Sequence, residues 1–407
     1  VTVVTRKWEN NIVYNRDNYF KEDEGNVEIS TISSTKCIYK IPNKHNKYFK
    51  LKSNKIIRKL KLYKFLTFIE QYLKWTKFNY FDNERDLYYK SRAILNKKSF
   101  DFVLTSGEPF VLFKYARNLK REFNIPIVLD YRDGWSTNSQ RNSSRNIFHK
   151  MILWNEKRVE NKIISASDIL IFASETLRDS ITKEFNIKKQ PFQEVINNGV
   201  KFLDEIPKKK HFLKEEKFYI AFIGSLYDDH NIDLFLDSIE ETIIKHNCKN
   251  IVLVFVGALL NCPNFHEKKI ESFKRKFKEN ILIIDYLNNT DAIKIQFESS
   301  ILLKFNSFEQ KKGHFGKKLY EYAFSGKKVL AIDKKEGFNN ELDFFDDRPF
   351  VYNCNSQEKI TSKVLMFYKK WQKKEPLINK INKNELLKYS TLSQSKLLEQ
   401  LLFSYLN

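Results

Sequence analysis

Two adjacent lysines and a glutamate lie at the predicted start of one helix. Lys317, Lys318 and Glu321 follow the apolar run Ile301–Phe305 and a loop, and Gly326 marks the predicted end of the helix. A helix start presents unpaired N–H groups and the positive end of the helix dipole, an arrangement that suits a phosphate. A carboxylate one turn further accepts hydrogen bonds from sugar or ribose hydroxyls. The pattern indicates an anion site, although two lysines in so basic a chain also fit a solvated surface.

A second set of charged residues follows a predicted strand in the first half of the chain. Arg132 and Asp133 end the run that begins at Ile127, and Glu108 follows Ser106-Gly107. Ligands bind beyond the carboxyl ends of parallel strands, so we expect these three side chains to face a cleft. Asp133 is the candidate general base and Arg132 the candidate anion contact. A structural ion pair of Arg132 with Asp133 or Asp130 explains the same residues equally well.

The histidines and cysteines show no spacing typical of a metal site. The chain has seven histidines and four cysteines, and the cysteines lie far apart. We therefore predict no catalytic metal and no resident cofactor. Sparse cysteines also favour a reducing, cytoplasmic compartment over a secreted disulfide scaffold.

Short apolar runs alternate with longer amphipathic segments along the chain, which predicts α/β architecture with parallel sheets covered by helices. The expected strands are Val1–Thr5, Phe102–Thr105, Ile127–Leu129, Ile169–Phe172, Glu194–Asn197, Tyr219–Ile223, Ile251–Val256, Ile281–Ile284, Ile301–Phe305, Val329–Ile332 and Phe350–Tyr352. The fold class we predict is two doubly wound domains that face each other across a cleft.

The 407 residues suffice for two domains. A lysine run and Pro207 make 201–217 the expected linker between domains at 1–200 and 218–383. Leucines at helical spacing predict a packed terminal helix over 384–407. Because the chain opens in a strand without Met, we also expect its first βα unit to be missing.

A net charge of +22 raises the question of an anionic partner. Nine of the twenty-one residues in 44–64 are basic, and aromatic and aliphatic residues alternate with them through Ile69. This composition suits an amphipathic element on an anionic membrane surface through 44–69. A solvated helix accounts for it as well, and a single-stranded nucleic-acid groove is the least favoured reading.

The segment from Lys318 to Leu330 resembles the nucleotide-sugar motif of glycosyltransferase family 4-like enzymes, which have the GT-B fold of two Rossmann-like domains. Further segments match the same family in order, namely 101–109, 127–135, 166–169, 197–200, 222–225 and 255–257. The resemblance implies a cytoplasmic enzyme, peripheral on the inner face of the membrane, that moves a sugar from a UDP or GDP donor to a polysaccharide or lipid-linked oligosaccharide.

The resemblance also assigns residues. It places the donor diphosphate against the backbone at Leu319 and the ribose hydroxyls on Glu321. The predicted donor-binding set is Gly224, Ser225, Tyr286, Gly316, Lys317, Lys318, Leu319 and Glu321. The predicted catalytic residues are Asp133, Arg132 and Glu108.

Two departures from the family pattern leave the activity open. Gly313 stands where the family has a sugar-binding glutamate, and Glu309 and Gln310 are the candidates to replace it. Ser225 and His230 replace an arginine and a lysine that neutralise the diphosphate. The alternatives are therefore a catalytically silent GT-B module, a sugar-nucleotide epimerase of the same fold, and a nucleic-acid binder.

Overall fold

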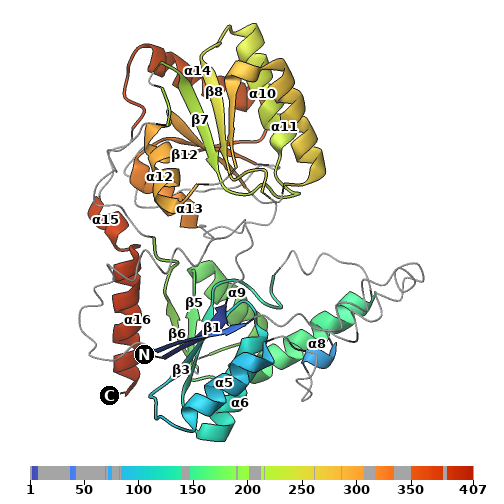
Figure 1. Cartoon of the computed structure of the whole chain (residues 1–407), viewed down its shortest axis with the longest axis vertical. Helices are drawn as coiled ribbons and strands as arrows, with labels where there is room; N and C mark the ends of the chain where they lie inside the picture. The colour runs from blue at the N-terminus through green and yellow to red at the C-terminus, as the bar shows by residue number, and fades with distance from the viewer. Residues whose placement is uncertain are drawn as a thin grey trace. The chain divides into compact units, whose positions relative to one another are not determined.

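The chain divides into two compact units, Val1–Ile196 (unit 1) and Asn197–Asn407 (unit 2). The computed structural model (Figure 1) describes residues 2–7, 37–42, 69, 72–75, 82, 84–138, 147–188, 191–200, 212–214, 216–260, 262–285, 287–306, 317–333, 350–378 and 383–406. Most of the predicted membrane element 44–69 lies outside these residues. None of the helices in this described part has the length and apolar character needed to cross a bilayer.

Unit 1 contains a four-stranded parallel sheet in the order β3-β4-β5-β6 and a separate parallel pair β1-β2. Strands β4 and β5 are buried along their whole length, which explains their unbroken apolar sequences. The elements are β1 (Thr2–Lys7), β2 (Cys37–Pro42), α5 (Arg85–Leu95), β3 (Val103–Gly107), α6 (Val111–Phe123), β4 (Ile127–Tyr131), α8 (Ile147–Ile164), β5 (Ile169–Phe172), α9 (Glu175–Phe185) and β6 (Phe192–Val195).

Unit 2 is a doubly wound six-stranded parallel sheet in the order β12-β11-β10-β7-β8-β9. Its elements are β7 (Phe218–Ile223), α10 (Ile232–Lys245), β8 (Ile251–Val256), α11 (Asn264–Lys276), β9 (Ile281–Ile284), α12 (Asn289–Glu298), β10 (Ile301–Phe305), α13 (Lys317–Ser325), β11 (Val329–Ile332), β12 (Val351–Cys354), α14 (Gln357–Gln372), α15 (Lys383–Leu387) and α16 (Thr391–Leu406). This is the strand order of a Rossmann fold. The two Rossmann-like units confirm the predicted α/β fold class.

Alternate residues of the strands in unit 2 point to two separate cores. Phe218, Ile220 and Phe222 of β7 pack under α10, α11 and α14, whereas Tyr219 and Ala221 pack under α12, α13 and α15. Strand geometry, with successive side chains on opposite faces, produces this division. Figure 1 shows α10 and α11 on one side of the sheet and α12 on the other.

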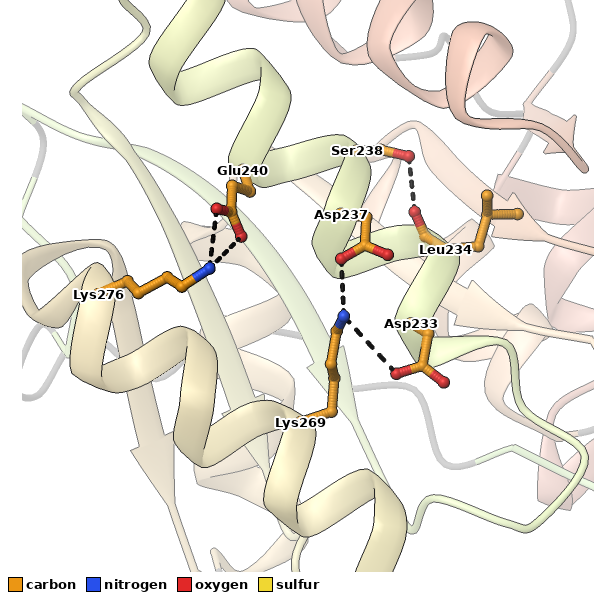
Figure 2. A network of polar contacts seen from close by, with 7 residues as sticks. All are labelled: Asp233, Leu234, Asp237, Ser238, Glu240, Lys269 and Lys276. Carbon is orange, nitrogen blue, oxygen red and sulfur yellow. Dashed lines mark hydrogen bonds and ion pairs between the residues drawn. The ribbon is translucent and has the colours of Figure 1, made fainter.

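Ion pairs join the outer faces of α10 and α11 (Figure 2). Lys269 Nζ lies 2.7 Å from Asp237 and 4.0 Å from Asp233, and Lys276 Nζ lies 3.1 Å from Glu240. Exposed pairs of this kind contribute about 0–1 kcal/mol each to stability. They fix how α10 and α11 lie against each other and do not involve the ends of the strands.

The expected terminal helix over 384–407 is two helices, so that expectation was wrong. The backbone pairs with Val200 on both sides of Ser390, because Val200 N donates to Tyr389 O at 2.9 Å and Thr391 N donates to Val200 O at 3.0 Å. Ser390 Oγ then accepts from Ser393 N and begins α16. The helix is also less packed than expected, since only two of its residues are buried, Gln394 and Leu401.

The described end of the expected linker belongs to unit 2. Leu213 is buried in its core, and Glu298 on α12 accepts hydrogen bonds from the backbone N–H groups of Phe212 and Leu213 at 2.8 and 3.0 Å. The division between the units falls after Ile196 rather than after residue 200.

Candidate functional site

The sheet of unit 2 has one topological switch point, between β7 and β10. Only two residue pairs, Ile301↔Ile220 and Leu302↔Ala221, join these strands, whereas six pairs join β7 to β8. The two strands therefore separate toward their carboxyl ends. Ligands of open α/β sheets bind at such a point.

Gly224 is the first residue after β7 at this edge. Its φ of +132° is a conformation that side chains disfavour, and its N–H donates to Val256 O at 2.8 Å. A Cβ built at this position would lie 1.6 Å from Lys318 Nζ. Only glycine leaves room for the ammonium group that occupies this place.

Helix α13 begins at Lys317 and aims its first turn at the same edge. Leu319 and Tyr322 are buried beneath it, and Ile223 N donates to the Tyr322 hydroxyl at 3.4 Å. Lys318 is exposed, and its Nζ lies 5.6 Å from the centre of the Phe222 ring. Surrounding protein lowers the pKa of Lys318, while the charge of Glu321 raises it in part.

The predicted helix end is confirmed, because Gly326 follows α13 with a φ of +70°. The structure thus brings together Gly224, Lys318, Leu319 and Glu321. Five predicted residues lie outside the described part of the chain: Tyr286, Glu309, Gln310, Gly313 and Gly316. The side chain of Lys317 is not described either.

The loop after β7 brings a neutral imidazole to the switch point. His230 Nδ1 accepts from Tyr227 N at 3.2 Å, and the ring stacks on Phe305 with centroids 5.4 Å apart. Burial lowers the pKa of His230 to about 4, and the charges of His266, Lys318 and Lys304 lower it further against the opposing effect of Asp229. His230 is therefore neutral at pH 7 and supplies no cation.

Three polar residues at the ends of β10 and β11 complete the edge, and sequence analysis missed them. Lys304 Nζ donates to Asn306 Oδ1, and Asn306 Nδ2 donates to Asp333 Oδ1. Asn306 and Asp333 follow neighbouring strands of the sheet and are 27 residues apart in sequence. Only the strand pairing brings them together, so no local pattern reveals the cluster.

In unit 1, Arg132 forms a bidentate ion pair with Asp130. Its Nη2 lies 2.6 Å from Asp130 Oδ1 and its Nε donates to Asp130 Oδ2 at 2.8 Å, while Nη1 donates to Ile196 O. The ion pair of Arg132 with Asp130 is therefore present, and the anion contact expected of Arg132 stays a prediction. Asp133 and Glu108 are exposed in the loops after β4 and β3. Their catalytic roles stay predictions.

A buried acid lies behind this loop. Glu160 of α8 accepts from Ser136 N at 3.0 Å, and its other oxygen has no hydrogen-bond partner. The neighbouring Trp135 is buried, with its ring stacked on Phe110 at a centroid distance of 5.5 Å. Burial raises the pKa of Glu160 to about 7. This residue holds the loop that carries Arg132 and Asp133.

In the described ranges, no group of three histidine, cysteine or acidic residues has a metal-binding arrangement. A surface groove of about 820 Å³ lies between α10 and α14, with Glu241, Gln357 and Lys369 among its lining residues. It contains none of the predicted site residues.

The fold is that of GT-B proteins. Over 99% of both chains it is similar to the Anabaena protein HepE in complex with UDP-glucose, with a TM-score of 0.60 and 10% identity. It is similar over the full length of both chains to the lipopolysaccharide outer core galactosyltransferase WaaB, with a TM-score of 0.53 and 10% identity. The UDP-GlcNAc 2-epimerase of Methanocaldococcus jannaschii matches with a TM-score of 0.50 and 10% identity over 99% of both chains.

Residues 204–384 match the family model described as Glycosyl transferases group 1. The match covers the strands and helices that form the switch point. Comparison with curated protein sequences gives no match. Gly224, Lys318, Leu319 and Glu321 all lie within the matched range.

Proposed function

We propose that the chain transfers a sugar, with retention of configuration, from a UDP or GDP donor to a polysaccharide or lipid-linked oligosaccharide. The observation that carries the donor proposal is the contact between Lys318 Nζ and the Gly224 backbone at the switch point. A cation and a helix start meet there, where a diphosphate binds best. Of the similar structures, HepE contains UDP-glucose and WaaB is a lipopolysaccharide galactosyltransferase, which supports a UDP donor and an envelope glycan acceptor.

The departures at Ser225 and His230 are compatible with activity, because Lys318 supplies a cation from the opposite side of the site. The Lys318 ammonium group lies against Gly224 and takes the role of the diphosphate-neutralising cation that the β7 loop lacks. Preorganised charge at a leaving group is commonly the largest catalytic contribution. Turnover of any nucleotide sugar excludes the silent module, and conversion of the donor without an acceptor favours the epimerase.

Glu321→Ala tests the donor site. Thermal-shift and calorimetric titration with UDP, GDP, CMP and their common sugars should identify one nucleotide that stabilises the wild type. The substitution should weaken binding of that nucleotide about 10- to 100-fold, since it removes charged hydrogen bonds to hydroxyls. Glu271→Ala, an exposed glutamate of α11, is the matched control and should leave the affinity unchanged. Equal affinities of wild type and Glu321→Ala contradict the assignment.

We also propose that the protein works in the cytoplasm, peripheral on an anionic membrane surface. The outward face of α8 supports this: Ile147, Met151 and Trp154 are 68, 48 and 62% exposed, and Lys150 and Arg158 lie on the same face. Both acidic residues of α8, Glu156 and Glu160, are buried. Apolar and basic side chains on one face suit an anionic lipid interface. The same role of 44–69 stays a prediction.

Trp154→Ala combined with Arg158→Gln should reduce sedimentation with phosphatidylglycerol vesicles at least fivefold. A basic side chain near an anionic surface contributes about 1 kcal/mol, and the indole adds to it. Arg158 Cζ lies 5.9 Å from the Trp154 ring, so the two act at one place. Phe265→Ala removes an equally exposed aromatic from α11 and should change nothing. Undiminished binding of the double variant contradicts a membrane role of α8.

A further inference from the structure

Lys304 is a charged residue in an otherwise apolar strand at the switch point. In β10 it alone is partly exposed, while its four strand neighbours are buried. Leu302, two residues earlier, packs under α13, and alternation places Lys304 on that same face, which carries Lys318. A lysine here needs a partner, because a strand of this kind normally carries aliphatic residues only.

Asn306 and Asp333 hold the ammonium group at the carboxyl edge. The backbone continues the sheet at both residues, since Asn306 N donates to Ile332 O at 3.0 Å and Asp333 N donates to Cys354 O at 2.9 Å. The two side chains are 2 and 3% exposed, and they form the chain Lys304 to Asn306 to Asp333. The orientation of the Lys304 side chain is therefore determined before any ligand arrives.

The loop after β7 contributes no cation to this edge, since its polar residues include Ser225, the neutral His230 and the acidic Asp228 and Asp229. Burial lowers the pKa of Lys304 to about 8 against the opposing effect of Asp333, and the charge of Lys318 also lowers it. Two lysines that repel each other at a ligand-binding edge are stabilised when an anion lies between them.

We propose that Lys304 is a second phosphate-binding residue of the donor site, with Asn306 and Asp333 as positioning residues. The proposal rests on the proposed function, since it assumes a nucleoside diphosphate at the switch point. Lys304 and Lys318 then approach the diphosphate from β10 and α13. They replace the cations that the β7 loop lacks.

The competing explanation is that Lys304 only neutralises Asp333. The two explanations give opposite signs for Asp333→Asn. This substitution keeps the acceptor for Asn306 and removes the negative charge, so a phosphate-binding Lys304 should bind UDP as well as before or more tightly. A purely structural pair should lose stability and affinity on either substitution.

Calorimetric titration of the full chain with UDP, GDP, UMP and GMP tests the proposal. Lys304→Met should weaken binding of the preferred nucleoside diphosphate about 10- to 100-fold. It should reduce the preference of the protein for the diphosphate over the monophosphate by a similar factor. Lys304→Arg should restore part of the affinity, and Asp333→Asn should retain all of it. Lys276→Met, which removes the same charge from the far end of α11, should have no effect. Thermal unfolding confirms that each variant is folded.

Four results overturn the inference. Unchanged diphosphate affinity in Lys304→Met refutes it while the proposed function stands. Equal loss of mono- and diphosphate affinity, or equal loss in Lys304→Met and Asp333→Asn, assigns Lys304 a structural role. Absence of any nucleotide binding by the wild type refutes the inference together with the proposed function.

Discussion

Lys318→Met should lower the rate of sugar transfer by about 10²- to 10³-fold at saturating donor, the range found when one preorganised group is removed from a developing charge. Departure of a nucleoside diphosphate builds negative charge beside the Gly224 backbone, where Lys318 Nζ lies. Methionine fills similar space without the charge. The thermal stability should stay the same or rise slightly, because the ammonium group lies against the Gly224 backbone, where nearby protein lowers its pKa.

Release of UDP or GDP, coupled to a colorimetric reporter, measures this effect. Lys318→Arg is the control, since it keeps the charge and should recover a substantial part of the rate. Because Gly224 leaves space for one ammonium group only, the larger guanidinium should not restore it fully. A rate within threefold of wild type in Lys318→Met would remove this residue from the leaving-group site.

Glu160→Gln should stabilise the protein at pH 8 by about 3 kcal/mol and leave it unchanged at pH 4. Burial raises the pKa of Glu160 from 4.5 to about 7 in the folded chain. Below pH 4.5 the carboxyl is protonated in both states. Between pH 4.5 and 7 the unfolded chain loses the proton first, so the folded state is progressively disfavoured. Above pH 7 the folded state bears the full free-energy cost of burying the charged carboxylate, and the neutral glutamine avoids this cost.

Urea unfolding at pH 4, 6 and 8 measures the difference in free energy of unfolding between wild type and Glu160→Gln. The glutamine oxygen can keep the hydrogen bond from Ser136 N, so geometry is preserved. Glu175→Gln, an exposed residue of α9, should show no such pH dependence. A difference in unfolding free energy that stays constant from pH 4 to pH 8 would mean that the pKa of Glu160 is not raised.

The strands of unit 2 were predictable because buried parallel strands have unbroken apolar sequences. Four strands of unit 2 have the predicted bounds, Ile251–Val256, Ile281–Ile284, Ile301–Phe305 and Val329–Ile332, as does β5 (Ile169–Phe172) of unit 1. Strand β2 was not predicted, because its sequence, CIYKIP, is not an unbroken apolar run. Strand β6 begins two residues earlier than expected, because its side chains alternate between exposed and partly buried.

The site was predictable only where a local signal exists. Gly224 and Lys318 were found because a glycine after a strand and a lysine at a helix start are visible in sequence. Lys304 and Glu160 were not, because strand pairing brings Lys304 to Asp333 and helix packing brings Glu160 to Ser136. For the same reason, the break before α16 depends on Val200, which lies about 190 residues earlier.

Hydrogen exchange of the backbone amides, measured with and without the nucleotide that the screen identifies, tests directly whether the donor binds at the switch point of unit 2. We expect slower exchange on binding in the peptides that cover 224–231 and 317–322, which contain the β7 loop and the start of α13. Peptides of the groove between α10 and α14 should exchange at unchanged rates. Protection confined to that groove, or to unit 1, would contradict a donor site at the switch point between β7 and β10.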